Sequence, residues 1–394
     1  MQRVMGVPVP LIVMLPMVLT TDKMDYQKIS NVPWEVSVGL LMTYRCNLDC
    51  KYCYIHTKKA IDMSLDMAQK ILEPYLQKED GYVNIALMGG ETLAAFDVLK
   101  PLVEWIENGK WPSRFRIFGN TNGTLLNDEM REWFKEHSSS ITLGLSYDGL
   151  PESQENNRTL LPVDLDFFIK IWPKQTIQMT INTETVNRMA EGVIYLLERG
   201  ARVHPNVAYE GGEWSDDDIK EYRKQLDILA DFYNRRPELP KISQFDHFIQ
   251  TYADAIDNPQ PQFQICGAGQ RFHLYDVDGK SYPCHLLSPL VLSPEKLNPI
   301  SDGLVQKVTS FADPKCKGCP FVSLCPTCIG CNYIYRGDLQ KRDSTHCRVM
   351  KEEVKAFLRK EVRRLSKKRP LTPEDAADID AIAKLIKYFK SHRH

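Results

Sequence analysis

Six apolar runs of strand length recur along residues 37–209, and amphipathic helical patterns lie between the later runs. The runs are SVGLLMTY (37–44), YVNIALM (82–88), RFRIF (114–118), ITLGLS (141–146), TIQMTI (176–181) and VHPNVAY (203–209). Alternating strands and helices predict parallel strands joined by right-handed helical crossovers. Six units are too few to close an eight-stranded barrel. The predicted fold class is therefore α/β, with a partial (βα)6 TIM-like barrel.

Beyond Gly211 this alternation stops. Ser215 is placed to cap an amphipathic helix, and a loop-rich, cysteine-rich region follows over residues 264–347. Two helical stretches close the chain, and the second opens with Thr372 as N-cap and Pro373 at its first position. The predicted domains are an N-terminal extended arm (1–34), the partial barrel (35–235), a cysteine-rich auxiliary domain (236–350) and C-terminal helices (351–394).

The composition is that of an ordinary globular protein. Of the 394 residues, 43% are hydrophobic and 26% are charged, and the net charge of −1 creates no overall field for nucleic acid or a membrane surface. The basic stretch 351–369 and the acidic run 216–218 are expected to be solvated. Residues 4–21 are uncharged and reach the lower length limit of a membrane span, but prolines interrupt them. We expect an extended or hairpin-like arm there, with a signal peptide as the alternative.

Eleven cysteines occur, and most stand at CxxxCxxC or CxxC spacings. An odd count clustered in this way favours metal ligation over a secreted disulfide framework. Because thiolate sites need a reducing compartment, we expect a cytoplasmic protein. Cys46, Cys50 and Cys53 lie within eight residues and leave a metal with an incomplete ligand shell. Three thiolates can hold a four-iron cluster with one iron open to another ligand, and a three-ligand zinc site is the alternative.

Unusual polar residues follow five of the predicted strands. The cysteine triplet follows the first run, GGE (89–91) the second, NTNG (120–123) the third, SYDG (146–149) the fourth and NTET (182–185) the fifth. In barrels of this class the chemistry lies at the carboxyl ends of the strands. These clusters are therefore expected to share one rim.

The cysteine triplet resembles the CxxxCxφC signature of the radical S-adenosylmethionine (SAM) superfamily. The resemblance implies that Cys46, Cys50 and Cys53 bind a 4Fe-4S cluster whose open iron is chelated by SAM. Reductive cleavage of SAM would then give a 5′-deoxyadenosyl radical. It also implies a SAM site with adenine beside Tyr52, the methionine amino group at Gly89, Gly90 and Glu91, and further contacts at Asn122, Ser146 and Asp148.

Eight further cysteines lie in the last third of the chain, enough for two more four-iron clusters. GKSYPC (279–284) and CKGCPFVSLC (316–325) resemble the SPASM extension of peptide-modifying radical enzymes. By that resemblance, Cys316, Cys319, Cys325 and Cys347 hold an outer cluster, and Cys266 and Cys284 belong to an inner one. The family's next cysteine would stand at Ile329, so either Cys328 and Cys331 both complete the inner cluster or one is a free thiol. A zinc ribbon is the alternative for the CxxC pairs.

This two-part layout resembles anaerobic sulfatase-maturing enzymes and the maturases of ribosomally made peptides. Where the former have an aspartate base after the GxxxxC cysteine, this chain has His285, the candidate catalytic residue. We therefore expect a peptide maturase that abstracts hydrogen from a precursor peptide and forms an intramolecular crosslink (a thioether, carbon–carbon or carbon–heteroatom bond). The alternatives are a peptide epimerase, a sulfatase-maturing enzyme, a small-molecule radical enzyme and a non-catalytic metal-binding scaffold.

The expected partners are the precursor peptide and an electron donor such as flavodoxin or ferredoxin. About 35 residues precede the first strand, too few for an independent leader-binding core. We expect a separate leader-recognition protein, or the barrel with residues 1–21, to bind the leader instead.

Overall fold

The computed structural model describes seven segments of the chain. They are residues 34–55, 58–208, 213–245, 249–259, 266–308, 312–325 and 327–392. The apolar stretch 4–21 and the rest of the predicted arm before Trp34 lie outside the described residues. Within these seven segments, no helix is long and apolar enough to cross a membrane.

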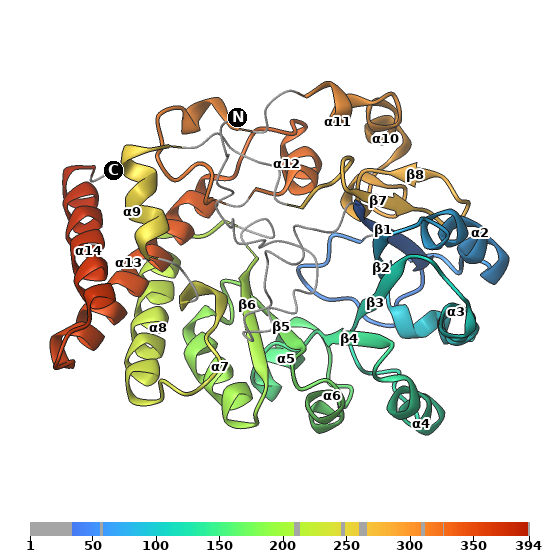
Figure 1. The fold of residues 1–394 in the computed structure, drawn as a ribbon, viewed down its shortest axis with the longest axis horizontal. Helices are drawn as coiled ribbons and strands as arrows, with labels where there is room; N and C mark the ends of the chain where they lie inside the picture. The colour runs from blue at the N-terminus through green and yellow to red at the C-terminus, as the bar shows by residue number, and fades with distance from the viewer. Residues whose placement is uncertain are drawn as a thin grey trace. The chain divides into compact units, whose positions relative to one another are not determined.

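All six predicted strands are present. They are β1 (Trp34–Thr43), β2 (Gly81–Gly89), β3 (Arg114–Thr121), β4 (Ile141–Leu145), β5 (Thr176–Ile181) and β6 (Arg202–Val207). Two further short strands follow them, β7 (Phe272–Tyr275) and β8 (Ser281–Tyr282). The main sheet has the order β4-β3-β2-β1-β7-β8, parallel except for the antiparallel pair β7–β8, and β5 pairs with β6 in a second sheet. Parallel strands alternating with helices confirm the predicted α/β, partial-barrel class (Figure 1).

Strands β7 and β8 lie in the region predicted as loop. They have four and two residues, too few to give a periodic apolar pattern. β7 still extends the barrel sheet, because residues 37–40 of β1 pair with residues 272–275 in parallel register. The hairpin that leads to Cys284 is therefore built onto β1, the strand that leads to Cys46.

The helices predicted between the strands, after Ser215 and at the end of the chain are present, and several other helices that were not predicted accompany them. The helices are α2 (Leu65–Leu76), α3 (Phe96–Asn108), α4 (Asp128–His137), α5 (Pro151–Asn157), α6 (Leu165–Ile171), α7 (Met189–Glu198), α8 (Asp216–Arg235), α9 (Ile249–Asp257), α10 (Pro294–Ser301), α11 (Leu304–Lys307), α12 (Ile329–Arg336), α13 (Ser344–Lys367) and α14 (Pro373–Ser391). The Ser64 side chain accepts the N–H of Met67 at the start of α2. Ser215 and Thr372 each form a capping box, at α8 and α14.

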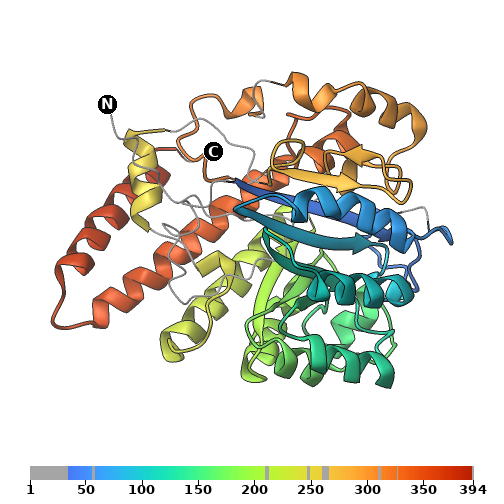
Figure 2. The same cartoon turned by 45° about the vertical axis from the view of Figure 1, so that its right-hand side comes forward.

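The chain divides into two compact units, each assembled from separate stretches of sequence. The first comprises Met1–Tyr147, Arg158–Ile177 and Gln264–Thr309, and the second comprises Asp148–Asn157, Gln178–Phe263 and Ser310–His394. In the first unit, α2 and α3 lie side by side along the sheet (Figure 2). Helix α3 buries Leu99, Leu102, Val103 and Ile106 completely, so its apolar stripe belongs to the core. The predicted domain boundaries stay a prediction.

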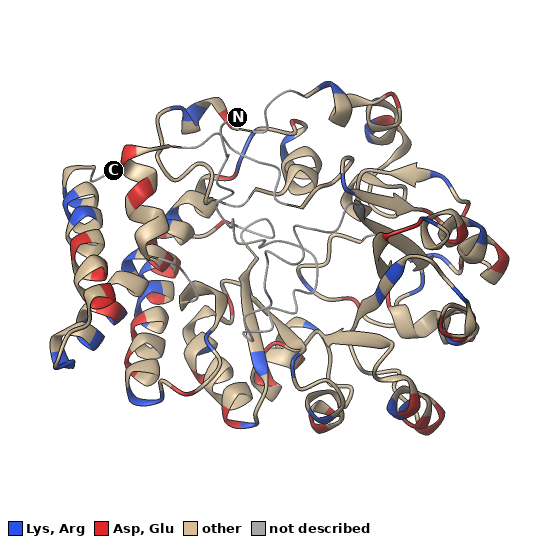
Figure 3. Cartoon of the chain, in the orientation of Figure 1, with Lys and Arg blue, Asp and Glu red and all other residues tan. Residues whose placement is uncertain are grey.

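In the second unit, α8 packs along α13 and α9 packs against α14. The acidic run 216–218 and the basic stretch 351–369, which were expected to be solvated, each contribute one residue to an ion pair across the first of these contacts. Asp216 pairs with Arg348 at 2.6 Å, and Asp227 pairs with Arg359 at 2.7 Å. Figure 3 shows both charge signs along these helices. Complementary charges therefore line the α8–α13 interface.

Candidate active site

The three cysteines of the first predicted cluster lie in the loop at the carboxyl end of β1. Cys46, Cys50 and Cys53 are each half-buried. The N–H of Ile55 donates to the Cys53 Sγ at 3.4 Å, and the Lys58 ammonium interacts electrostatically with Cys46 and Cys53. Backbone N–H donors and a nearby cation stabilise thiolates and iron–sulfur clusters. This donor set fits a three-thiolate cluster site.

The GGE sequence at the end of β2 is bonded to the backbone that leads into Cys46. The Gly90 N–H donates to the Thr43 carbonyl oxygen at 3.0 Å, and the Glu91 N–H donates to the Arg45 carbonyl oxygen at 2.8 Å. A Cβ at Gly90 would stand 2.3 Å from that Arg45 oxygen. Only glycine permits this approach, so Gly90 holds the cysteine loop against β2.

The carboxylate of Glu91 is bonded within the chain. The Thr121 hydroxyl donates to Oε1 at 2.5 Å, the Leu93 N–H donates to Oε1 at 3.0 Å, and the Asn122 N–H donates to Oε2 at 2.7 Å. Burial raises the pKa of Glu91, and these three donors lower it. Since a carboxylate has about four acceptor positions, Oε2 can accept one more donor. Glu91 thus joins β2 to β3, and its contact with the SAM amino group stays a prediction.

The turn after β3 is bonded to the cysteine loop through Asn122. Its amide donates to Asn47 Oδ1 at 3.0 Å, and its own Oδ1 accepts the Thr124 N–H at 2.9 Å. The Asn47 amide in turn donates to the Thr124 hydroxyl at 2.8 Å. Next along the sheet, the Ser146 N–H donates to the Thr121 carbonyl oxygen at 2.9 Å. The structure therefore brings the rim residues of β1 to β4 together, while the SAM contacts of Asn122 and Ser146 stay predictions.

Tyr52, the predicted neighbour of adenine, is half-buried between two of the cysteines. The Arg158 guanidinium lies 5.2 Å from the centre of its ring, and Arg158 also interacts electrostatically with Glu91. A cation–π contact of this kind fixes the plane of the ring. The adenine contact itself stays a prediction.

Two tyrosines on either side of the cysteine loop bond to the segment around Cys284. The Tyr44 hydroxyl is 2.7 and 2.8 Å from the two carboxylate oxygens of Asp276. The Tyr54 hydroxyl lies 2.8 Å from His285 Nε2. Neither tyrosine nor Asp276 was predicted from the sequence, because pairs more than 200 positions apart leave no local pattern. The one signal in the sequence that could have pointed to Tyr44 and Tyr54 is their position next to the cysteine loop.

His285 is 6% exposed, and burial lowers its pKa to about 4. The imidazole is therefore neutral near pH 7. Its Nε2 already contacts the Tyr54 hydroxyl, and the centres of the two rings are 5.4 Å apart. This geometry suits a group that positions Tyr54, and the predicted catalytic role of His285 stays a prediction.

Asp148 belongs to the second unit, where it is 1% exposed. The Asn157 amide donates to Oδ2 at 3.0 Å, and the Thr180 N–H donates to Oδ1 at 2.9 Å. Its own N–H donates to the Gln154 side chain at 3.0 Å. Asp148 thus joins α5 to β5, and its predicted contact with SAM remains untested.

The four predicted ligands of the outer cluster lie close together in the second unit. Burial raises the pKa of the Cys325 thiol to about 12, Arg342 lowers it, and Cys347, Cys316 and Cys319 raise it further. In the part of the chain that the structure describes, no group of three or more His, Cys, Asp or Glu side chains is spaced to hold a single metal ion. Four mutually interacting thiols are the kind of donor set that holds a four-iron cluster.

The cysteines assigned to the inner cluster are divided between the units. Cys266 and Cys284 lie in the first unit, and Cys328 and Cys331 lie in the second. Cys328 is the N-cap of α12, where its Sγ accepts the Cys331 N–H at 3.4 Å. The inner cluster stays a prediction.

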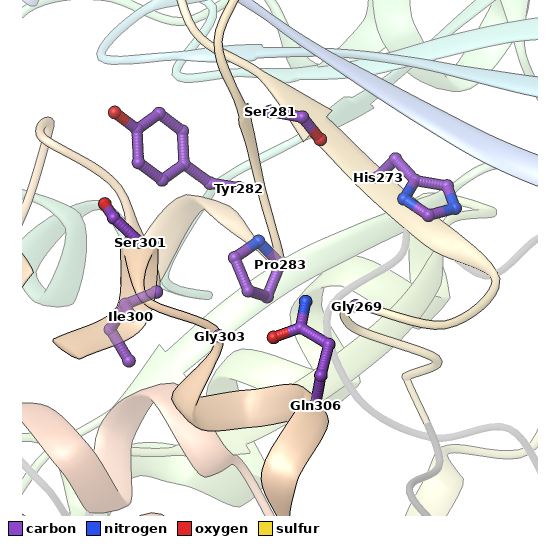
Figure 4. Close-up of a pocket in the computed structure, with 9 residues that line it drawn as sticks. All are labelled: Gly269, His273, Ser281, Tyr282, Pro283, Ile300, Ser301, Gly303 and Gln306. Atoms are coloured by element: carbon purple, nitrogen blue, oxygen red, sulfur yellow. The ribbon is translucent and has the colours of Figure 1, made fainter.

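A cavity of about 140 Å³ lies within the first unit, beside Pro283, the residue before Cys284. Its lining includes His273 and Ser281 of the β7–β8 hairpin, Pro283, and Gln306 of α11 (Figure 4). This volume has room for a few water molecules and is too small for a peptide segment.

The comparison with protein families identifies the class of enzyme. A model described as the Radical SAM superfamily matches residues 40–226. The match begins in β1, contains the cysteine triplet and GGE, and ends within α8. The chain therefore contains a radical SAM domain, which confirms the resemblance inferred from the triplet. Domains of this class bind SAM and one 4Fe-4S cluster.

Among individual proteins, a cysteine-type anaerobic sulfatase-maturating enzyme of Clostridium perfringens is 23% identical over 321 residues, which cover 71% of this chain and 84% of that enzyme. An uncharacterized protein of Methanocaldococcus jannaschii is 34% identical over 111 residues, covering 28% of this chain and 38% of the relative. The first similarity extends well beyond the radical SAM domain, into the cysteine-rich region.

Two solved structures share the fold. Native anSMEcpe with bound AdoMet has a TM-score of 0.60 at 21% identity, covering 84% of this chain and all of that one. SuiB of Streptococcus suis, bound to the precursor peptide SuiA, has a TM-score of 0.55 at 18% identity, covering 81% and 78%. Both similarities confirm the fold.

Proposed function

We propose that this chain is a radical SAM peptide maturase whose product is an intramolecular crosslink. The cysteine loop carries the proposal: the loop that contains three half-buried thiols is bonded through the carbonyl of Arg45 to the GGE turn of β2, and through Asn47 to Asn122 in the turn of β3. A peptide substrate is supported by the similarity to SuiB, which was solved with a precursor peptide.

Each residue of the loop has a distinct part in this proposal. When bound, SAM and its cluster supply hydrogen-atom abstraction. Cys46, Cys50 and Cys53 hold the cluster, and Lys58 offsets the negative charge of the thiolates. Glu91, whose Oε2 can accept one more donor, would hold the SAM amino group at the rim where its carboxylate links β2 to β3.

The proposed crosslink follows from the electron count. Removing one hydrogen atom leaves a substrate radical, and closing that radical into a new bond with loss of a proton releases one further electron. An epimerase instead returns a hydrogen atom and releases no electron. The eight further cysteines, proposed as ligands of two auxiliary four-iron clusters, supply a route for that electron. A flavodoxin or ferredoxin, a separate leader-recognition protein and a reducing cytoplasm complete the proposal.

Formylglycine formation is the second candidate. It is favoured by the similarity to the cysteine-type sulfatase-maturating enzyme over 71% of this chain. It is disfavoured at His285, which takes the position of that family's aspartate base and is buried against Tyr54. The reaction is also a two-electron oxidation, so the fate of the substrate decides between the two.

Mass spectrometry of a precursor peptide encoded beside the gene tests the proposal. Anaerobically reconstituted enzyme with SAM should remove about 2 Da per crosslink, the mass of two hydrogens, and leave no aldehyde that a hydrazide captures. A Cys46→Ala/Cys50→Ala/Cys53→Ala variant is the control and should leave the peptide unchanged. Hydrazide-reactive product would establish formylglycine formation, and unchanged mass with deuterium uptake from D2O would establish epimerisation.

A further inference from the structure

A buried arginine lies beside two of the four cysteines of the predicted outer cluster. Arg342 is 6% exposed, and its Nη2 donates to the Cys325 carbonyl oxygen at 3.4 Å. Its charge acts on the thiols of both Cys316 and Cys325. Within the described segments, its Nε has no hydrogen-bond partner and its guanidinium forms no ion pair with a carboxylate.

The acidic side chain closest to Arg342 in the hydrogen-bond network is Asp313, and it serves other groups. Asp313 accepts the backbone N–H of Arg342 at 2.8 Å and the backbone N–H of Lys315 at 2.9 Å. Its carboxylate is also 3.5 Å from the Lys315 ammonium. Asp313 thus anchors the backbone and pairs with a different cation.

A buried guanidinium without a counter-charge is strongly unfavourable, and arginine does not relieve this cost by losing its proton. The structure therefore requires an anion beside Arg342. A thiolate-bound iron–sulfur cluster is such an anion, and two of its proposed ligands, Cys316 and Cys325, interact electrostatically with the guanidinium. The Cys325 thiol has a second polar neighbour in His346, whose Nε2 lies 3.2 Å from the Cys325 Sγ.

We propose that Arg342 is the counter-ion of the outer cluster and raises its reduction potential. The inference rests on the proposed function in one respect, that Cys316, Cys319, Cys325 and Cys347 hold a four-iron cluster. One electron enters the cluster from the oxidised substrate or from a ferredoxin-class donor, and no bond is made or broken. The reduced cluster carries one more negative charge, which the adjacent guanidinium stabilises, and net charge and hydrogen bonds set such potentials.

An EPR-monitored redox titration of the reconstituted enzyme tests this role without measuring turnover. The outer cluster's signal is the one that Cys325→Ala abolishes. At the potential where this cluster is half-reduced in the wild type, Arg342→Met should lower the reduced-to-oxidised ratio at least tenfold, which is 59 mV for a one-electron couple. Arg342→Lys, which keeps the charge, should stay within threefold. Arg359→Met, which removes a carboxylate-paired arginine of the same unit, should leave the ratio unchanged.

Chelator-treated full-length protein provides a second measurement. Without the cluster, the buried guanidinium lacks its anion, so cluster-free Arg342→Met should have a melting temperature no lower than that of the cluster-free wild type. The cluster-loaded variant should lose its outer cluster to chelator more readily than the loaded wild type. An unchanged potential in a loaded Arg342→Met variant would overturn the counter-ion role. Loss of zinc rather than iron in Cys325→Ala would refute the outer cluster itself, and with it the redox role.

Discussion

The buried carboxylate of Glu91 links the ends of β2 and β3 by hydrogen bonds at the candidate site. Glu91→Ala leaves the Thr121 hydroxyl and the Asn122 N–H without their acceptor, and a buried unsatisfied group costs about 1–3 kcal/mol. We expect the free energy of unfolding of SAM-free protein to fall by roughly 2–5 kcal/mol in urea titrations. SAM affinity should fall about ten- to hundredfold, because a charge-assisted hydrogen bond contributes about 1.5–3 kcal/mol.

Glu129→Ala is the matched control, since that carboxylate is 67% exposed on α4 and pairs with Lys100 on the surface. It should change neither quantity measurably. If Glu91→Ala lowered SAM affinity while unfolding stayed at the wild-type value, the brace between β2 and β3 would be wrong. Lower stability with unchanged SAM affinity would instead restrict Glu91 to a structural role.

At the scale of elements, the contact between α8 and α13 contains a carboxyl group that titrates near neutrality. The Tyr222 hydroxyl of α8 donates to Glu353 Oε1 of α13 at 2.6 Å. Burial raises the pKa of Glu353 to about 7, against the lowering effect of the hydrogen bonds from Tyr222 and Gln244. Folding therefore favours the protonated form, and this contribution to stability is complete below about pH 4.5 and is lost as the pH rises through 7.

Glu353→Gln should remove that pH dependence, because an amide keeps an acceptor for Tyr222 and carries no charge. The free energy of unfolding of the variant should exceed that of the wild type by up to about 3 kcal/mol at pH 8 and by little at pH 5. Urea titrations at the two pH values measure the difference. Tyr222→Phe, which removes a donor to the charged carboxylate, should shift the wild-type loss of stability to higher pH. Equal pH profiles for the wild type and Glu353→Gln would contradict the assignment.

The elements that the sequence predicted are those with a long local pattern. The strands that became β1 to β6 have extended apolar runs, and the caps at Ser215 and Thr372 stand directly before an amphipathic helical pattern. The rim of the site was predictable for the same reason, because strand ends fix where GGE and NTNG must lie. Strands β7 and β8 and the bonds from Tyr44 and Tyr54 depend on pairing between distant segments, so a local pattern could not reveal them.

For the whole molecule, the number of bound irons shows how many cysteines are ligands, and this number bears on which reaction the enzyme can catalyse. Eleven cysteines, as three ligands of the SAM-binding cluster and four each for two auxiliary clusters, hold about twelve irons. If all are ligands, no cysteine is left to return a hydrogen atom, which favours crosslinking over epimerisation. We therefore expect about twelve irons per chain by metal analysis and cubane signals by Mössbauer spectroscopy.

Cys328 and Cys331 decide this count, because both are needed to complete the inner cluster with Cys266 and Cys284. Cys328→Ala and Cys331→Ala should each lower the iron content to about eight per chain and stop crosslinking, since the electron released on bond closure loses its proposed route. A variant of either cysteine that kept about twelve irons would show that its thiol is free. An epimerase would incorporate deuterium from D2O into the peptide. If the wild type did so and that variant did not, the free thiol would be the hydrogen-atom donor and the enzyme an epimerase. Stoichiometric zinc with about four irons would instead place a zinc ribbon in the cysteine-rich region.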